Sequence, residues 1–154
     1  MLFALAFGIG VIAGLRALTA PAVVCWLAYL NVIHLQDTPL RFMGSAIAVG
    51  IFTLAAAGEI VSDKLPKTPP RTAAAGFGAR IATGALTGGA VFVAGGGSIW
   101  LGALAGIVGA VVGTYSGYFA RTRAVAALNC PDFMIALVED AIAIGGGIFI
   151  VSRL

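Results

Sequence analysis

The sequence predicts an all-α fold, a polytopic bundle of transmembrane helices in a single domain over residues 1–154. Hydrophobic residues make up 60% of the chain and charged residues only 10%, whereas soluble domains carry about 25% charged residues. Several apolar stretches reach the roughly 20 residues that a helix needs to cross a bilayer. The charged residues gather mostly between these stretches, where a membrane protein normally keeps them.

Five apolar stretches are expected to cross the membrane. The first contains Pro21, and because proline removes a backbone donor and kinks a helix, this stretch is expected to tilt or to break near that residue. Four spans plus a re-entrant first segment is the alternative. The five stretches are Leu2–Leu30, Phe42–Ser62, Phe77–Ala94, Ile99–Ala120 and Phe133–Ser152.

The distribution of basic residues predicts the orientation of the chain. Short cytoplasmic loops of membrane proteins are enriched in Lys and Arg. Two basic loops follow the second and fourth stretches, and the turn between them is uncharged; their residues are Lys64, Lys67, Arg71, Arg121 and Arg123. With five spans these loops share one side, which is expected to be the cytoplasm of a bacterial inner membrane. The N-terminus is then cytoplasmic and the C-terminus is outside.

The remaining composition excludes several classes of function. The net charge of +3 comes from these short loops and does not indicate nucleic-acid binding. The only histidine, His34, has no metal-ligand spacing around it, and no Ser or Cys stands beside a plausible base. We therefore expect no enzyme activity, cofactor or metal. The expected partners are the lipid bilayer, anionic lipid headgroups, and a small solute or ion; a homo-oligomer is left open.

The fourth stretch carries glycines spaced three or four residues apart, which places them on one helix face. Small residues on one face let helix backbones approach closely. This face is expected to pack against another helix in the bundle or in a dimer, and a glycine-lined pore is the alternative. Its residues are Gly102, Gly106, Gly109, Gly113 and Gly117.

Six ionisable residues fall inside the apolar stretches or at their ends: Arg16, Glu59, Asp63, Arg80, Glu139 and Asp140. A charge at the centre of a transmembrane helix costs about 2.5–3.5 kcal/mol on insertion scales, so such residues turn inward and find partners. In the five-span arrangement all six lie in the cytoplasmic half. We expect Arg16 or Arg80 to lie within salt-bridge reach of at least one of Glu59, Glu139 and Asp140, in a shared polar cluster.

This cluster has two interpretations. A transporter-like or channel-like protein would use it as a polar site in the cytoplasmic half of the bundle. A non-transporting scaffold that binds a partner protein or anionic lipid would use it to hold its helices in register. A weak internal repeat, in which Gly14-Leu-Arg16 resembles Gly78-Ala-Arg80, is in keeping with a transporter.

Four blocks of the chain resemble a known family. They are Gly14-Leu-Arg16-Ala, the block Glu59-Ile-Val-Ser-Asp63-Lys64-Leu-Pro66, Arg80 with Gly84-Ala85, and Pro131 followed by Glu139-Asp140. In this order they are similar to the bacterial membrane family catalogued as domain of unknown function 4126. The resemblance covers nearly the whole chain and implies a membrane protein, but no activity. The residues that carry it coincide with the charges found above from hydropathy.

The orientation can be tested by cysteine-accessibility labelling at Lys67, Arg123 and Ser98 in a cysteine-free background. Lys67 and Arg123 should be labelled from the cytoplasm and Ser98 from the other side, because positive charge is retained inside. Labelling of Lys67 and Arg123 from opposite sides would contradict the prediction.

Overall fold

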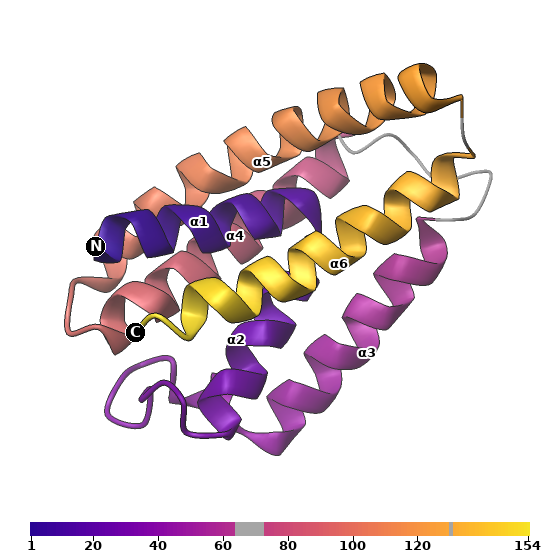
Figure 1. Ribbon diagram of the computed structural model, residues 1–154. Coiled ribbons are helices and arrows are strands. Elements are labelled where there is room, and N and C mark those ends of the chain that lie inside the picture. Colours follow the sequence, from indigo (N-terminus) through magenta and orange to yellow (C-terminus); the bar gives the residue numbers. More distant parts are fainter. Residues whose placement is uncertain (64–72, 130) are drawn as a thin grey trace.

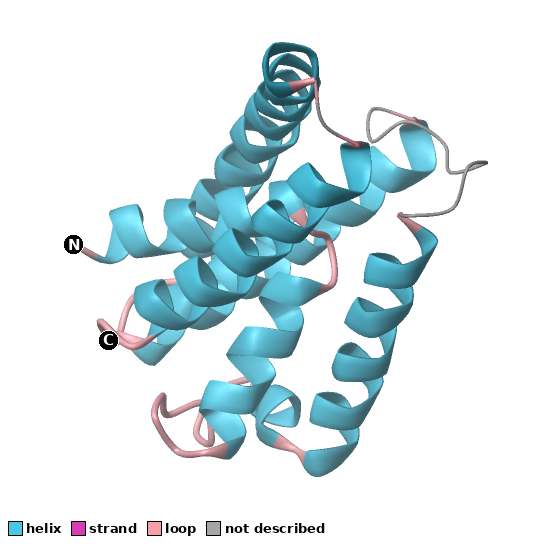
Figure 2. Cartoon of the chain, turned by 45° about the vertical axis from the view of Figure 1, so that its right-hand side comes forward, coloured by secondary structure: helices cyan, strands magenta, loops and turns pink. Residues whose placement is uncertain are grey.

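Helices are the only regular secondary structure in the described part of the chain, as Figures 1 and 2 show for a computed structural model that describes residues 1–63, 73–129 and 131–154. The helices pack side by side as one bundle, in agreement with the predicted all-α class. They are α1 (Leu2–Leu15), α2 (Thr19–Tyr29), the short 3-10 helix η1 (Arg41–Gly44), α3 (Ala46–Ser62), α4 (Ala74–Ala94), α5 (Ile99–Leu128) and α6 (Asp132–Val151).

Among the described residues, three helices are long and apolar enough to cross a membrane: α4, α5 and α6. The helices α1, α2 and α3 are apolar but shorter, with 14, 11 and 17 residues. Five full spans are therefore not confirmed. The second expected stretch also begins later than hydropathy suggested, because the Ser45 hydroxyl accepts the Ala48 N–H at 3.1 Å and starts α3 there.

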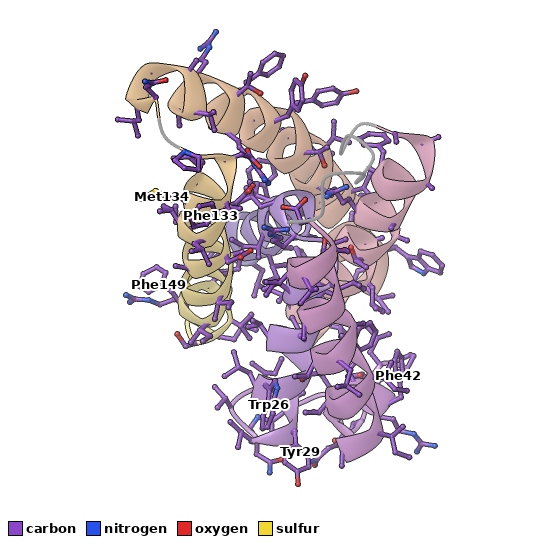
Figure 3. All side chains as sticks on the ribbon, turned by 90° about the vertical axis from the view of Figure 1, so that its right-hand side faces the viewer. Trp26, Tyr29, Phe42, Phe133, Met134 and Phe149 are labelled. Carbon is purple, nitrogen blue, oxygen red and sulfur yellow. The ribbon has the colours of Figure 1, made fainter. Side chains whose placement is uncertain are left out.

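The outside of the bundle is largely apolar, and four charged residues are buried inside it: Arg16, Arg80, Glu139 and Asp140. Figure 3 shows Phe133, Met134 and Phe149 pointing away from α6, with 49–57% of each side chain exposed. Arg16, by contrast, is only 1% exposed. This distribution is the reverse of a soluble domain, and it suits a chain whose outer surface is solvated by lipid.

The expected break of the first stretch near Pro21 is present, since the chain leaves its helix at Arg16 and folds back, and Leu2–Leu30 is not one continuous span. Arg16 is extended, with φ −138° and ψ 108°. A Cβ on Gly146 would touch Ile12 of α1, and one on the adjacent Gly147 would touch Val23 of α2. Both halves of the segment therefore lie along the same stretch of α6. The first segment enters the bundle and returns, as in the re-entrant alternative (Figure 1).

The proline accounts for the position of the break. In a continuous helix the ring of Pro21 would clash with the carbonyl of the residue four positions earlier, which is Ala17. In the first turn of α2 the missing N–H costs nothing, since the donors there have no partner inside the helix. The helix consequently stops before Ala17 and restarts at Thr19.

Both chain ends lie at the same end of the bundle (Figure 1). The Phe3 and Phe92 rings are 4.8 Å apart, so α1 begins beside the end of α4. Because the chain turns back between α1 and α2, it reverses direction once more than it would with a single span. The N-terminus therefore lies at the end opposite Arg121 and Arg123, and the expectation that it shares a side with these residues is wrong.

The expected basic loop after the fourth stretch is also wrong, because α5 continues as a helix to Leu128. Arg121 and Arg123 are helical, and the first left-handed residue is Asn129, with φ 47°. The apolar stretch ends at Arg121, but no Gly or Pro follows there to end the helix. The other three expected loop residues, Lys64, Lys67 and Arg71, lie outside the described residues.

All five glycines on the glycine face of α5 are buried, and four of them lie against α1 or α4: Gly102, Gly106, Gly109 and Gly113. A Cβ on Gly106 would lie 2.0 Å from the Gly84 carbonyl oxygen of α4, and one on Gly109 would lie 2.1 Å from the Phe7 oxygen of α1. The expectation of close helix packing is confirmed at these positions. Because backbone of α1 and α4 fills this space, the glycines do not line a pore there.

The two members of the weak repeat adopt different local structures. Arg16 is extended at the end of α1, whereas Arg80 lies within α4. The backbone therefore does not repeat at these two positions.

Gly109→Leu should lower the folded yield and the midpoint of thermal unfolding, because a side chain there would force α1 away from α5. Gly145→Leu is the matched control, since a Cβ at Gly145 meets nothing within 4 Å. Equal yields and midpoints for the two variants would contradict the observed packing.

Candidate functional site

The charged cluster is formed by side chains from α1, α3, α4, α5 and α6 around the break in the first segment. Arg16 follows α1, Glu59 lies in the last turn of α3 and Asp63 ends that helix, while Arg80 lies in α4 and Glu139 and Asp140 in α6. All six residues predicted from the sequence contribute. The charges lie together inside the bundle although they are distant in the chain.

Arg16 is the most deeply buried member of this cluster. Its Nη1 atom lies 2.8 Å from Asp63 Oδ2, and its Nε atom lies 2.6 Å from Asp140 Oδ1. The predicted pairing of Arg16 with a carboxylate of the last helix is confirmed. Its third nitrogen, Nη2, is buried without a hydrogen-bond partner among the described residues. Arg16 thereby ties the end of α1 to α3 and α6.

Glu59 binds backbone as well as lying near a charge. Its Oε1 atom accepts the Ala17 N–H at 2.9 Å, and its Oε2 atom accepts the Leu18 N–H at 2.8 Å. These donors stand at the N-terminus of α2, where the helix dipole also favours an anion. Arg80 Nη2 lies 4.0 Å from Oε1, so the predicted pair is present at the limit of salt-bridge distance.

Arg121 joins the cluster, although the sequence placed it in a loop. Its Nη1 atom lies 2.7 Å from Asp63 Oδ2, the same oxygen that Arg16 binds, and 3.6 Å from Glu139 Oε2. Its Nε atom donates to Asp132 Oδ1 at 2.8 Å, and its Nη2 atom pairs with Asp132 Oδ2. This two-pronged contact has the geometry that suits a guanidinium best.

Asp132 is the residue that sequence reasoning missed. It lies in the first turn of α6, directly after Pro131, where an acidic residue also suits the helix dipole. A proline followed by an acidic residue at a helix start was the available signal. The sequence did not identify Arg121 as its partner, because Arg121 was predicted to lie in a loop.

Glu139 and Asp140 are adjacent but serve different partners. Residues one apart on a helix point about 100° away from each other. Asp140 turns toward Arg16, whereas Glu139 turns toward Arg121 and also lines a cavity of about 520 Å³ between α5 and α6. The cluster therefore borders an open space on one side. Within the described residues, no group of three or more His, Cys, Asp or Glu could hold a metal ion.

The family model for domain of unknown function 4126 (DUF4126) matches residues 3–152, nearly the entire chain. The chain belongs to the DUF4126 family. No curated protein and no solved structure matches it. For this DUF4126 chain the comparisons thus give the family but no activity, and the role of the cluster is argued from its geometry.

The Arg16–Asp140 pair should be strongly coupled. Removing one partner of a buried ion pair costs about 3–5 kcal/mol because the other charge is stranded. Arg16→Ala and Asp140→Ala should each lower the unfolding free energy in detergent, and the double variant should lose less than the sum of the two. The exposed Asp37→Ala is the control and should change little. Additive losses in the double-mutant cycle would show that the pair is not coupled.

Glu59→Ala should destabilise the protein whether or not Arg80 is present. Its partners are the N–H groups of Ala17 and Leu18, which stay buried and unsatisfied after the change. An unsatisfied buried donor costs about 1–3 kcal/mol. Denaturation of Glu59→Ala and of Glu59→Ala/Arg80→Ala should show no rescue. A clear rescue by loss of Arg80 would mean that the ion pair dominates.

Proposed function

We propose that this protein is a transporter-like membrane protein in which the charged cluster at the break between α1 and α2 is the site for a small solute or ion. The proposal rests on the break between α1 and α2. The backbone ends of two half-helices meet inside the bundle, and they are held by side-chain charges from other helices. Discontinuous helices of this kind form the binding sites of many secondary transporters, because half-helix ends bind charged groups.

The charge arrangement supports this role. Arg16 stands at the end of α1, and Glu59 stands at the start of α2, so each charge complements the helix dipole that it faces. Glu59 has donors on two sides, the Ala17 and Leu18 N–H groups and the Arg80 guanidinium. A charged solute that replaced one of these contacts would leave the other in place. The site can therefore exchange partners without stranding a charge.

The orientation that we propose follows from the basic end of the bundle. Arg121 and Arg123 lie toward one end of α5, and the positive-inside rule assigns that end to the cytoplasm of a bacterial inner membrane. The charged cluster then lies in the cytoplasmic half. The N- and C-termini, at the other end in Figure 1, then face outward.

A scaffold that binds a partner protein or anionic lipid is the second candidate. The observation that favours it is the mutual pairing of the cluster, in which Arg16 and Arg121 share Asp63 and hold α1, α3 and α5 together. Paired charges of this kind also serve only to fix helix positions. The two candidates differ in whether charge moves across the membrane.

Flux through purified protein in liposomes separates the two candidates. Proton flux is measured with an internal pH dye under a valinomycin-set potential, and small ammonium and carboxylate solutes are screened by solid-supported membrane currents. The wild type should give a signal for at least one of these probes. Glu59→Gln should abolish the signal because it loses the charge; since the amide keeps only one of the two oxygens that accept the Ala17 and Leu18 N–H groups, its elution profile is compared with that of the wild type before flux is measured. Folded wild type without any signal in this panel would favour the scaffold.

A further inference from the structure

The cavity between α5 and α6 has the size and position of a ligand site. Its volume of about 520 Å³ lies inside the range of about 300–1,000 Å³ for small-molecule pockets. The α5 wall is made of small residues, Ser116, Gly117, Ala120 and Ala124, which leave space between the helices. The facing wall is branched and apolar, formed by Ile135, Val138 and Ile142. We call this cavity the α5–α6 groove.

The groove opens on the part of the surface that faces lipid. Three residues that line it, Leu128, Val138 and Ile142, are 67%, 56% and 56% exposed. Exposed large apolar residues on a membrane helix are in contact with acyl chains. A molecule with an alkyl chain can therefore enter from the bilayer without passing through water.

The polar end of the groove is formed by Arg121 and Glu139. Three carboxylates surround the Arg121 guanidinium: Nε and Nη2 contact Asp132, and Nη1 contacts Asp63 and Glu139. This surplus of negative charge around one guanidinium suits a cationic head, and because a carboxylate has about four lone-pair sites, Glu139 can add a contact to those it has. A phosphate or carboxylate head would be placed against the carboxylates around Arg121.

We propose that the α5–α6 groove binds a long-chain amine in its protonated form. The alkyl chain lies along the apolar walls, and the ammonium donates to Glu139. Binding at the groove follows from its own walls and charges. The further statement that the bound amine is the transported solute rests on the proposed function. In that case the amine would reach the charged cluster laterally, from the bilayer.

The test uses the full chain in phosphatidylcholine nanodiscs and measures binding without flux. A doxyl-labelled stearylamine is added, and the immobilised fraction of its electron paramagnetic resonance spectrum is compared with those of the chain-matched alcohol and carboxylic acid. The wild type should immobilise the amine several-fold more than either analogue. Because no transport is measured, an amine signal together with absent flux would leave the site standing and remove only the transport role.

Two substitutions test the contact with the alkyl chain and the contact with the ammonium group separately. Ala124→Leu fills the groove and should abolish immobilisation, whereas Ala126→Leu, the same substitution at an exposed position of α5, should leave it unchanged. Glu139→Gln keeps the shape and should remove the preference for the amine over the alcohol. If Ala124→Leu fails to fold, Glu139→Gln decides the outcome.

Three results would overturn the proposal. Equal immobilisation in Ala124→Leu and Ala126→Leu would place the amine elsewhere. Equal immobilisation of amine, alcohol and acid by the wild type would mean that the groove holds only lipid chains. Stronger immobilisation of the acid would show an anion site at Arg121 instead.

Discussion

The structure depends on the contact between the Glu59 carboxylate and the backbone N–H groups of Ala17 and Leu18. A helix broken inside an apolar bundle exposes donors that no water can satisfy. Glu59 satisfies two of them with one side chain, and its negative charge suits the start of α2. With this contact in place α2 can fold back, α1 can end where Arg16 meets its partners, and both chain ends come to one end of the bundle.

The second constraint is the sharing of Asp63 between Arg16 and Arg121. One carboxylate oxygen accepts from both guanidinium groups, so the end of α3 joins the end of α1 and the second half of α5. Asp140 and Asp132 then extend the network along α6. Because desolvated charges are costly when they lose a partner, this network ties helix positions together more strictly than apolar packing alone. The proposed transport role and a purely structural role therefore involve the same residues.

Small residues serve two different purposes on α5. On one face Gly106, Gly109 and Gly113 let the backbones of α1 and α4 come into direct contact. On another face Ala120 and Ala124 are met by branched residues of α6 at a greater separation, and a groove remains. The composition of the two faces is similar. What differs is the neighbour, since α1 and α4 lie close along the glycines, whereas Arg121 and its carboxylates bridge the space between α5 and α6.

The sequence by itself determined the class of protein, the approximate positions of the later helices and six members of the cluster. Hydropathy reports the cost of transferring each stretch into lipid, and buried charges such as Arg16 and Asp140 must find partners inside the bundle wherever the helices run. The glycine spacing likewise predicted a close helix–helix contact, but it did not identify the helices that make this contact. Only the tertiary structure decided that the first stretch is two helices, that Arg121 belongs to the cluster with Asp132, and that Glu59 binds backbone. The reason is that apolar length does not distinguish a span from a hairpin of the same composition. The choice between them rests on Glu59, 41 residues further along the chain than Leu18, reaching the donors that the break exposes.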